Sequence, residues 1–207
     1  KFRSKTRSRQ TKNKKTDRGQ NNIMLHSDQI LATVEMIQKE NLDVRAVTMG
    51  IDLLDCRSRD VSHTCDRIRE KICRYADSLV KTCDSISKQY GIPVVNKRIA
   101  VTPIASVGAG YSRDAFVLLA EALDRAAGTV GIDFLGGFSA NVENGMSRAS
   151  RELILAIPEA LSRTNKVCGS VNVGSSKYGI NMDALAMLGQ TIKELAEISA
   201  DTGGFAA

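Results

Sequence analysis

Residues 166–181 read Lys166-Val-Cys-Gly-Ser-Val-Asn-Val-Gly-Ser-Ser-Lys-Tyr-Gly-Ile-Asn181. The first half alternates apolar with small or polar side chains, which is typical of a β-strand with two different faces. A Gly/Ser-rich turn follows, and Asn181 is placed to cap a helix that runs to about residue 199. The segment therefore predicts a strand, a turn and a helix in direct succession.

The same succession recurs upstream. Apolar, β-branched stretches predict strands at residues 44–51, 94–101 and 132–138. Apolar residues three or four positions apart predict helices at residues 27–40, 60–90, 113–127 and 148–161. Strands separated by helices of this length are parallel and joined by crossovers, so the fold class is α/β.

Alternate residues of a strand point to opposite sides, and each expected strand has one largely apolar face. In residues 132–141 we assign Ile132, Phe134, Gly136 and Phe138 to that face. The opposite faces become small and polar, above all toward the carboxyl ends of the strands. The two sides of the sheet therefore face different surroundings.

A doubly wound sheet with helices on both sides favours two apolar faces, whereas a barrel with outer helices accommodates a partly polar interior. We therefore favour a parallel β/α barrel whose lumen holds a ligand or substrate. Arg45 and Lys97 fall on the apolar faces and are exceptions to the pattern.

Four strands do not close a barrel, so three arrangements stay open. The chain is part of a longer barrel, it completes its sheet with another subunit, or its sheet remains open. The sequence ends just after Gly203 and Gly204, where a further strand is due. We expect a truncated chain that forms about half of a barrel.

The net charge of +6 is concentrated at one end of the chain. Residues 1–22 hold nine Lys or Arg against one Asp, a charge of +8, which leaves −2 for the rest. We expect a disordered basic tail over residues 1–23 and one domain over residues 24–207. The tail is either a phosphate-binding arm or sequence ahead of a start at Met24, and we favour the second.

Composition limits the classes of partner and the compartment. No apolar run approaches the roughly 18 residues of a membrane helix, and no apolar signal region is present, so we expect a cytoplasmic protein without membrane contact. With no Trp and 4% aromatic residues, nucleic-acid binding outside the tail is not expected. Five cysteines indicate reduced thiols, and their spacing argues against a metal site.

The Gly/Ser-rich turn contains the first candidate ligand-binding residues. A turn that leads into a helix presents backbone N–H groups and the positive end of the helix dipole to an anion. Ser175, Ser176 and Lys177 add further donors. The alternative is an ordinary glycine-rich turn, because the Gly-x-x-x-x-Gly-Lys spacing of a P-loop is absent.

The polar strand faces supply the other candidates. The expected ligand-binding residues there are Asp52, Asn96, Arg98, Asn141 and Asn172. Two interpretations of Arg98 stay open: an internal pair with a carboxylate, or two hydrogen bonds to a carboxylate or phosphate of the substrate.

Cys168 is the candidate catalytic residue, because it falls on the polar face of its strand. A thiol nucleophile needs an activating partner, and neither His26 nor His63 is near it in sequence. The alternative is a buried, inert thiol.

Four stretches in this order resemble a prokaryotic family, the uncharacterised protein family two-ten, also catalogued as a domain of unknown function. They are Thr48-Met-Gly-Ile-Asp-Leu-Leu-Asp-Cys56, Gly91-Ile-Pro-Val-Val-Asn-Lys-Arg-Ile-Ala-Val-Thr-Pro103, Gly131-Ile-Asp-Phe-Leu-Gly-Gly-Phe-Ser-Ala140 and residues 166–183. The resemblance covers residues 27–200, the amino-terminal portion of longer family members. It implies a β/α barrel akin to pyruvate formate-lyase and other glycyl radical enzymes, but no reaction, because the family has no established activity.

We therefore expect an enzyme-like barrel that binds a small anionic metabolite in its lumen. The reaction and any cofactor stay open, and a homo-oligomer is expected. The alternative is a non-catalytic regulatory or scaffold protein that oligomerises.

Overall fold

A computed structural model of the chain describes residues 27–39 and 43–204. Its centre is a sheet of four parallel strands in the order β1-β2-β3-β4. The strands are β1 (Val44–Ile51), β2 (Val94–Val101), β3 (Phe134–Asn141) and β4 (Val167–Asn172). The parallel sheet and the α/β class confirm the prediction from sequence, with β1 and β4 at the two edges. The expected basic tail, residues 1–23, lies outside the described residues.

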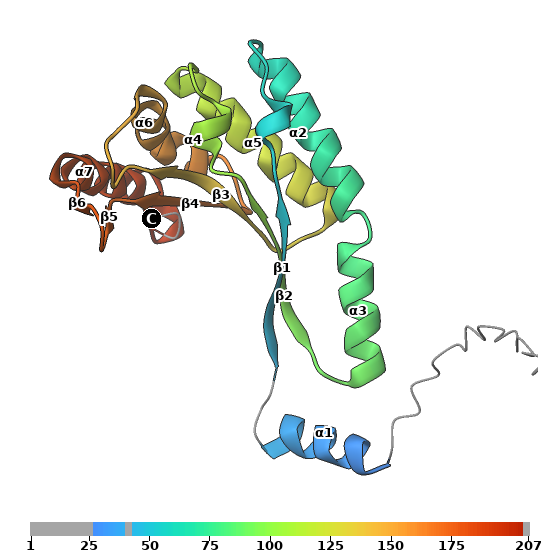
Figure 1. Ribbon diagram of the computed structural model, residues 1–207. Coiled ribbons are helices and arrows are strands. Elements are labelled where there is room, and N and C mark those ends of the chain that lie inside the picture. The colour runs from blue at the N-terminus through green and yellow to red at the C-terminus, as the bar shows by residue number, and fades with distance from the viewer. Residues whose placement is uncertain (1–26, 40–42, 205–207) are drawn as a thin grey trace, which may run out of the picture.

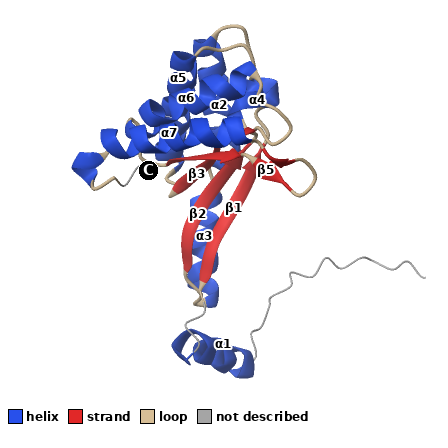
Figure 2. Cartoon of the chain, turned by 90° about the vertical axis from the view of Figure 1, so that its left-hand side faces the viewer, coloured by secondary structure: helices blue, strands red, loops and turns tan. Residues whose placement is uncertain are grey.

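The helices between the strands lie on one side of the sheet, while α1 precedes β1 and α7 follows β4 (Figures 1 and 2). They are α1 (Ser27–Lys39), α2 (Val61–Ala76), α3 (Leu79–Tyr90), the short α4 (Ile104–Val107), α5 (Arg113–Val130), α6 (Arg148–Ser162) and α7 (Met182–Ile198). Helices α2, α5, α6 and α7 form a layer, α3 follows the lower part of β2, and α1 stands apart. None of the helices in these ranges is both long and apolar enough to cross a membrane.

The helix expected over residues 60–90 is two helices, which corrects the prediction. Its ends are as expected: Asp60 caps α2 by accepting hydrogen bonds from the N–H groups of Ser62 (3.2 Å) and His63 (3.3 Å), and Gly91 (φ 70°) ends α3. Between them the chain turns at residues 77–78. The break lets α2 pack on α5 while α3 packs on β2, which a straight helix cannot do (Figure 1).

The hydrophobic core lies between the sheet and the helical layer. Helix α5 is its centre, and Phe116, Leu119 and Leu123 are fully buried there. The sheet contributes Ile99 from β2 and Phe138 from β3, both almost completely buried. Each such side chain contributes about 1.5–3 kcal/mol by leaving water, so burial on one face holds the layers together.

Strand β3 contains an irregularity that the sequence did not reveal. Its register with β4 shifts between Gly136 and Phe138. The residue inserted there places both Leu135 and Phe138 against the helices, where both are fully buried. Phe134 lies on the opposite face and is 40% exposed, so our assignment of Phe134 to the apolar side was wrong.

The charged exceptions on the apolar faces have ion-pair partners. Lys97 reaches α3, where its Nζ lies 3.0 Å from Asp84 Oδ1. This hydrogen bond raises the pKa of Lys97, so the side chain stays charged beside the helix. Arg45 Nε lies 3.2 Å from Asp43 Oδ1. Neither residue therefore breaks the division of the sheet into two faces.

We predict that Gly137→Ala destabilises the protein by about 2–4 kcal/mol, because the site needs glycine for two reasons. Its φ is +121°, and a Cβ there meets Val101 Cγ2 and Val101 O at 2.5 Å. Gly128→Ala in α5 is the control: its Cβ meets nothing within 4 Å, so up to about 1 kcal/mol of stabilisation is expected. Urea unfolding measures both, and equal stability of the two variants would contradict the assignment.

Candidate binding site at the carboxyl edge of the sheet

The face of the sheet opposite the helices is open in the described part of the chain. The side chains that it presents are small or polar, apart from Phe134. Those classed as exposed include Thr48, Asp52, Arg98, Ala100, Cys168, Ser170 and Asn172. We call this surface the open face. It carries the residues that the alternation pattern assigned to a lumen.

Polar residues mark the carboxyl end of every strand of the sheet. Asp52 and Thr102 follow β1 and β2, and Asn141 and Asn172 end β3 and β4 as register partners. Asp52 Oδ1 accepts hydrogen bonds from Thr102 Oγ1 (2.5 Å) and from Leu54 N–H (3.1 Å). These two bonds hold the pKa of Asp52 below its ordinary value, because they favour the charged carboxylate. A fixed carboxylate therefore lies at this edge.

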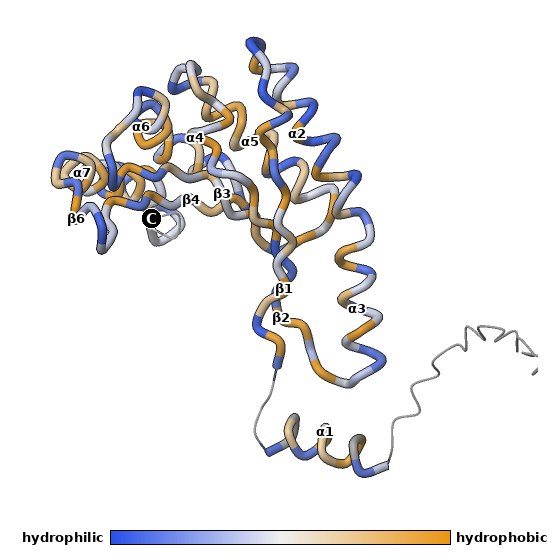
Figure 3. The backbone as a smooth tube through the Cα atoms, viewed as in Figure 1, coloured by the Kyte–Doolittle hydropathy of each residue, from blue (hydrophilic) through white to orange (hydrophobic). Residues whose placement is uncertain are grey.

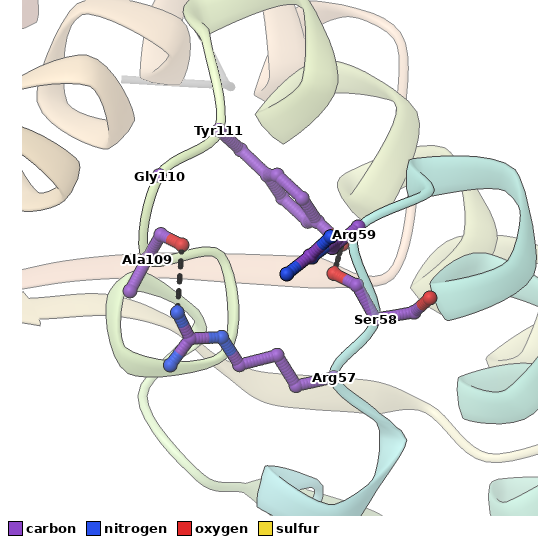
Figure 4. A pocket seen from close by; sticks show the side chains of 6 residues that line it. All are labelled: Arg57, Ser58, Arg59, Ala109, Gly110 and Tyr111. Atoms are coloured by element: carbon purple, nitrogen blue, oxygen red, sulfur yellow. Dashed lines mark hydrogen bonds between the residues drawn. The ribbon is translucent and has the colours of Figure 1, made fainter.

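Two pockets open at the same edge. The first, of about 480 Å³, is lined by Arg57, Ser58, Arg59, Ala109, Gly110 and Tyr111 (Figure 4). The second, of about 450 Å³, lies between the loops that follow β2 and β3, and Asn141, Ser147 and Arg148 line it. Ala109 and Gly110 belong to both linings and separate the two spaces. In α/β folds, ligands bind at the carboxyl ends of the strands, which is where both pockets lie.

Hydrogen bonds hold the walls of the first pocket together. The hydroxyl of Tyr111 donates to Ser58 O (2.6 Å) and lies 2.7 Å from Thr64 Oγ1. Across the opening, Arg57 Nη2 donates to Ala109 O at 3.1 Å, as Figure 4 shows. These contacts join the loop after β1 to the segment after α4, so the pocket has a defined shape.

Arg98 lies halfway along β2 rather than at the edge. Its guanidinium stacks on the ring of Phe134, 5.4 Å from the ring centre. No carboxylate of residues 27–39 or 43–204 is within ion-pair distance of it, so the internal pair that we considered for Arg98 is not formed there. Asn96 donates from Nδ2 to Arg45 O at 3.1 Å, which occupies that amide group.

The Ser175–Lys177 turn lies beyond the β4 side of the sheet, away from β2, the strand that carries Arg98 (Figure 1). It is the tip of a hairpin of β5 (Gly174–Ser175) and β6 (Gly179–Ile180), in which Ser175 Oγ accepts a hydrogen bond from Tyr178 N–H. The turn therefore does not lead directly into the helix, which corrects that expectation. The expected cap of α7 is present: Asn181 Oδ1 accepts from Ala184 N–H at 3.1 Å.

Cys168 is exposed on the open face of β4, so the structure differs from the alternative of a buried thiol. His63 lies on α2, on the other side of the sheet, and His26 is outside the described residues. A Cys-His pair is thus not formed by His63. No group of three or more His, Cys, Asp or Glu in the described ranges is arranged to hold a metal ion.

Sequence reasoning missed the arginines of the two pockets, Arg57, Arg59 and Arg148. They lie outside the strands, in loops or at a helix start, where no strand periodicity marks a face. One signal was available: each lies six to ten residues past the carboxyl end of an expected strand, in the region where α/β proteins bind ligands.

The fold and its edge pockets define an α/β protein with a parallel sheet, helices on one side and a candidate binding site at the carboxyl ends of the strands. The family model described as "Uncharacterised ACR (DUF711)" matches residues 35–207. The chain belongs to this family.

Relatives described as UPF0210 proteins agree with that assignment. The chain is 53% identical to one from Ruminiclostridium cellulolyticum over 183 residues, 88% of this chain and 40% of the relative. It is 52% identical to one from Oleidesulfovibrio alaskensis, covering 87% of this chain and 40% of the relative. It is 48% identical to one from Clostridium perfringens, covering 88% and 41%. The chain thus spans about 40% of the length of these relatives.

We predict that Thr102→Val raises the pKa of Asp52 toward its ordinary value, because the variant removes the hydrogen bond that lowers it most. A lowered carboxyl pKa stabilises the fold above the pKa of the unfolded chain, and this contribution is lost as the pH falls through the lower folded value. Thr102→Val should reduce the acid dependence of unfolding, whereas Thr102→Ser keeps the hydroxyl. Carbon NMR titration of the Asp52 carboxyl measures the effect. The same titration midpoint in the wild type, Thr102→Val and Thr102→Ser would refute it.

Proposed function

We propose that this chain forms part of a β/α barrel, akin to that of the glycyl radical enzymes such as pyruvate formate-lyase, and that the open face becomes the lumen and binds a small anionic metabolite. One observation carries the proposal: helices cover one face of the parallel sheet, and the other presents small and polar side chains. A cytoplasmic enzyme of unknown reaction fits this arrangement.

The length of the relatives supports closure of the barrel. About 60% of each relative lies outside the match, which is enough chain for further strand–helix units. Exposed Phe134 on the open face also favours a cover, because a large apolar side chain gains free energy when it leaves water. We propose that the additional strands enclose the open face.

The charge on the open face indicates the class of ligand. One flat face of the Arg98 guanidinium lies on the ring of Phe134. The N–H groups around the rim of the guanidinium remain available to a carboxylate or phosphate. Asp52, fixed by Thr102, lies nearer the carboxyl edge, and Cys168 is the candidate catalytic thiol on β4. Asn141 and Asn172 add amide groups at the edge. Arg98 and the two amides suit a small, polar anion, and Asp52 suits a hydroxyl or N–H group of the same ligand.

A thermal-shift screen with anionic metabolites tests the proposal. We expect at least one to raise the unfolding midpoint of the wild type and to lose most of that effect in Arg98→Ala. Arg74→Ala is the matched control, because Arg74 also stacks on an aromatic ring, that of Tyr75 at 4.9 Å, but on α2. The proposal fails if no anion stabilises the wild type more than Arg98→Ala.

A non-catalytic scaffold that oligomerises is the second candidate, and α1 supports it. In Figure 3 this helix stands apart from the body and carries hydrophobic residues. Ile30 is 49% exposed, Leu31 64% and Val34 41%. Apolar residues spaced three to four apart on one helix face are typical of a contact surface. A homo-oligomer that buries this face is proposed.

Sedimentation of Ile30→Glu tests whether α1 joins copies of the chain, and product analysis of the assembled protein separates a scaffold from an enzyme. If α1 joins copies of the chain, Ile30→Glu should shift the population to monomers, because a charge on the apolar face opposes burial. Ala32→Glu places the same charge on the opposite side of α1 and should leave the assembly intact. Unchanged sedimentation of Ile30→Glu would remove α1 as the contact.

A further inference from the structure

The two edge pockets share one short wall, and three arginines line them in total. Arg57 and Arg59 line the first pocket, and Arg148 lines the second. The wall is Ala109–Gly110, which belongs to both linings. Gly110 has no side chain, and a Cβ there meets nothing within 4 Å, so this part of the wall borders open space.

The three arginines keep their charge available. None makes an ion pair with a carboxylate in the described ranges, and each is exposed. By contrast, Arg163 after α6 is neutralised: it pairs with Glu159 at 2.6 Å and with Glu121 at 3.5 Å. The edge of the sheet therefore has positive charge that the protein does not neutralise.

Acidic groups near the pockets are engaged elsewhere, with one exception. Asp60 accepts two N–H groups at the start of α2, and Glu152 accepts from Arg113 N–H. Glu143, in the loop after β3, has a buried Oε2 with no hydrogen-bond partner in the described part of the chain. It does not line either pocket, and Arg148 is the charged residue of the second lining.

Hydrogen bonding leaves the arginines able to act as donors. Arg57 donates from Nη2 to Ala109 O, which fixes the guanidinium beside the wall. Its other N–H groups stay available to a ligand. Arg59 and Arg148 have no hydrogen-bonded side-chain partner in the described residues. Guanidinium groups bind carboxylate or phosphate oxygens through paired N–H donors. Each pocket therefore supplies a place for one anionic group.

We propose that the two pockets form one site for a small molecule with two anionic groups, carboxylate or phosphate, joined by a short chain. Arg57 and Arg59 bind one group, Arg148 binds the other, and the connecting chain passes over Gly110. The inference rests on the proposed function, because it specifies the anionic metabolite at the mouth of the same barrel. It assigns the two ends of the ligand to residues outside the open face.

Calorimetric titration of the protein tests the assignment with probes that carry one or two anionic groups. Acetate and inorganic phosphate carry one group; succinate, glutarate and pyrophosphate carry two. A probe that reaches both pockets should bind at least about tenfold more tightly than the single group of the same chemistry. Comparison of glutarate with pyrophosphate distinguishes carboxylate from phosphate ligands.

Three single substitutions identify the residues responsible. Arg59→Met and Arg148→Met should each reduce binding of the two-group probe to about that of the single group, about a tenfold loss. Both side chains are exposed and make no hydrogen bond or ion pair with the described residues, so little effect on stability is expected. Arg151→Met is the matched control on α6, one turn past Arg148, and should change affinity by less than about twofold.

Arg98→Met separates this inference from the proposed function. Binding that depends on Arg98 but not on Arg59 or Arg148 overturns the two-pocket site and leaves the lumen site in place. Dependence on Arg59 and Arg148 alone supports the two-pocket site and overturns the role of Arg98. Equal affinity for one-group and two-group probes, or an equal loss in Arg151→Met, overturns the inference.

Discussion

Burial of apolar side chains against one face of a parallel sheet is the constraint on which this structure depends. Helix α5 buries Phe116, Leu119 and Leu123 against strands that offer Ile99 and Phe138 in return. Because nearly all large apolar side chains of the sheet point to that side, the other face is left to small and polar residues. The parallel direction of the strands puts their carboxyl ends at a common edge, where loops rather than packed helices determine the chemistry.

The edge differs from the open face in how its polar groups are held. At the edge, Asp52 is fixed by a hydroxyl and an amide, and Tyr111 joins two loops. On the open face, Arg98 is held chiefly by the ring of Phe134. An edge with fixed groups suits recognition of a ligand's charged ends, whereas the open face needs a cover before it excludes water. The edge therefore suits recognition of the charged groups of a ligand, and the open face, once covered, suits its enclosure.

Periodicity and capping residues predicted the fold well, because both are local. Asp60, Gly91 and Asn181 end or begin helices where the sequence placed them. The bulge at Gly136–Phe138 was not predictable, since it depends on the register between two strands. The break at residues 77–78 depends on packing against α5 and β2. The candidate site was predicted in part: its strand residues follow from alternation, but Arg57, Arg59 and Arg148 come together only through loops distant in sequence.

Strand β4 is an outer strand of the sheet, and this position has a consequence for association. One of its margins offers backbone N–H and C=O groups that no neighbouring strand of the described sheet pairs. Such a margin accepts any extended segment of suitable length, whether it comes from the same polypeptide or from a second molecule. An unpaired margin of this kind favours self-association through the main chain, independently of side-chain recognition.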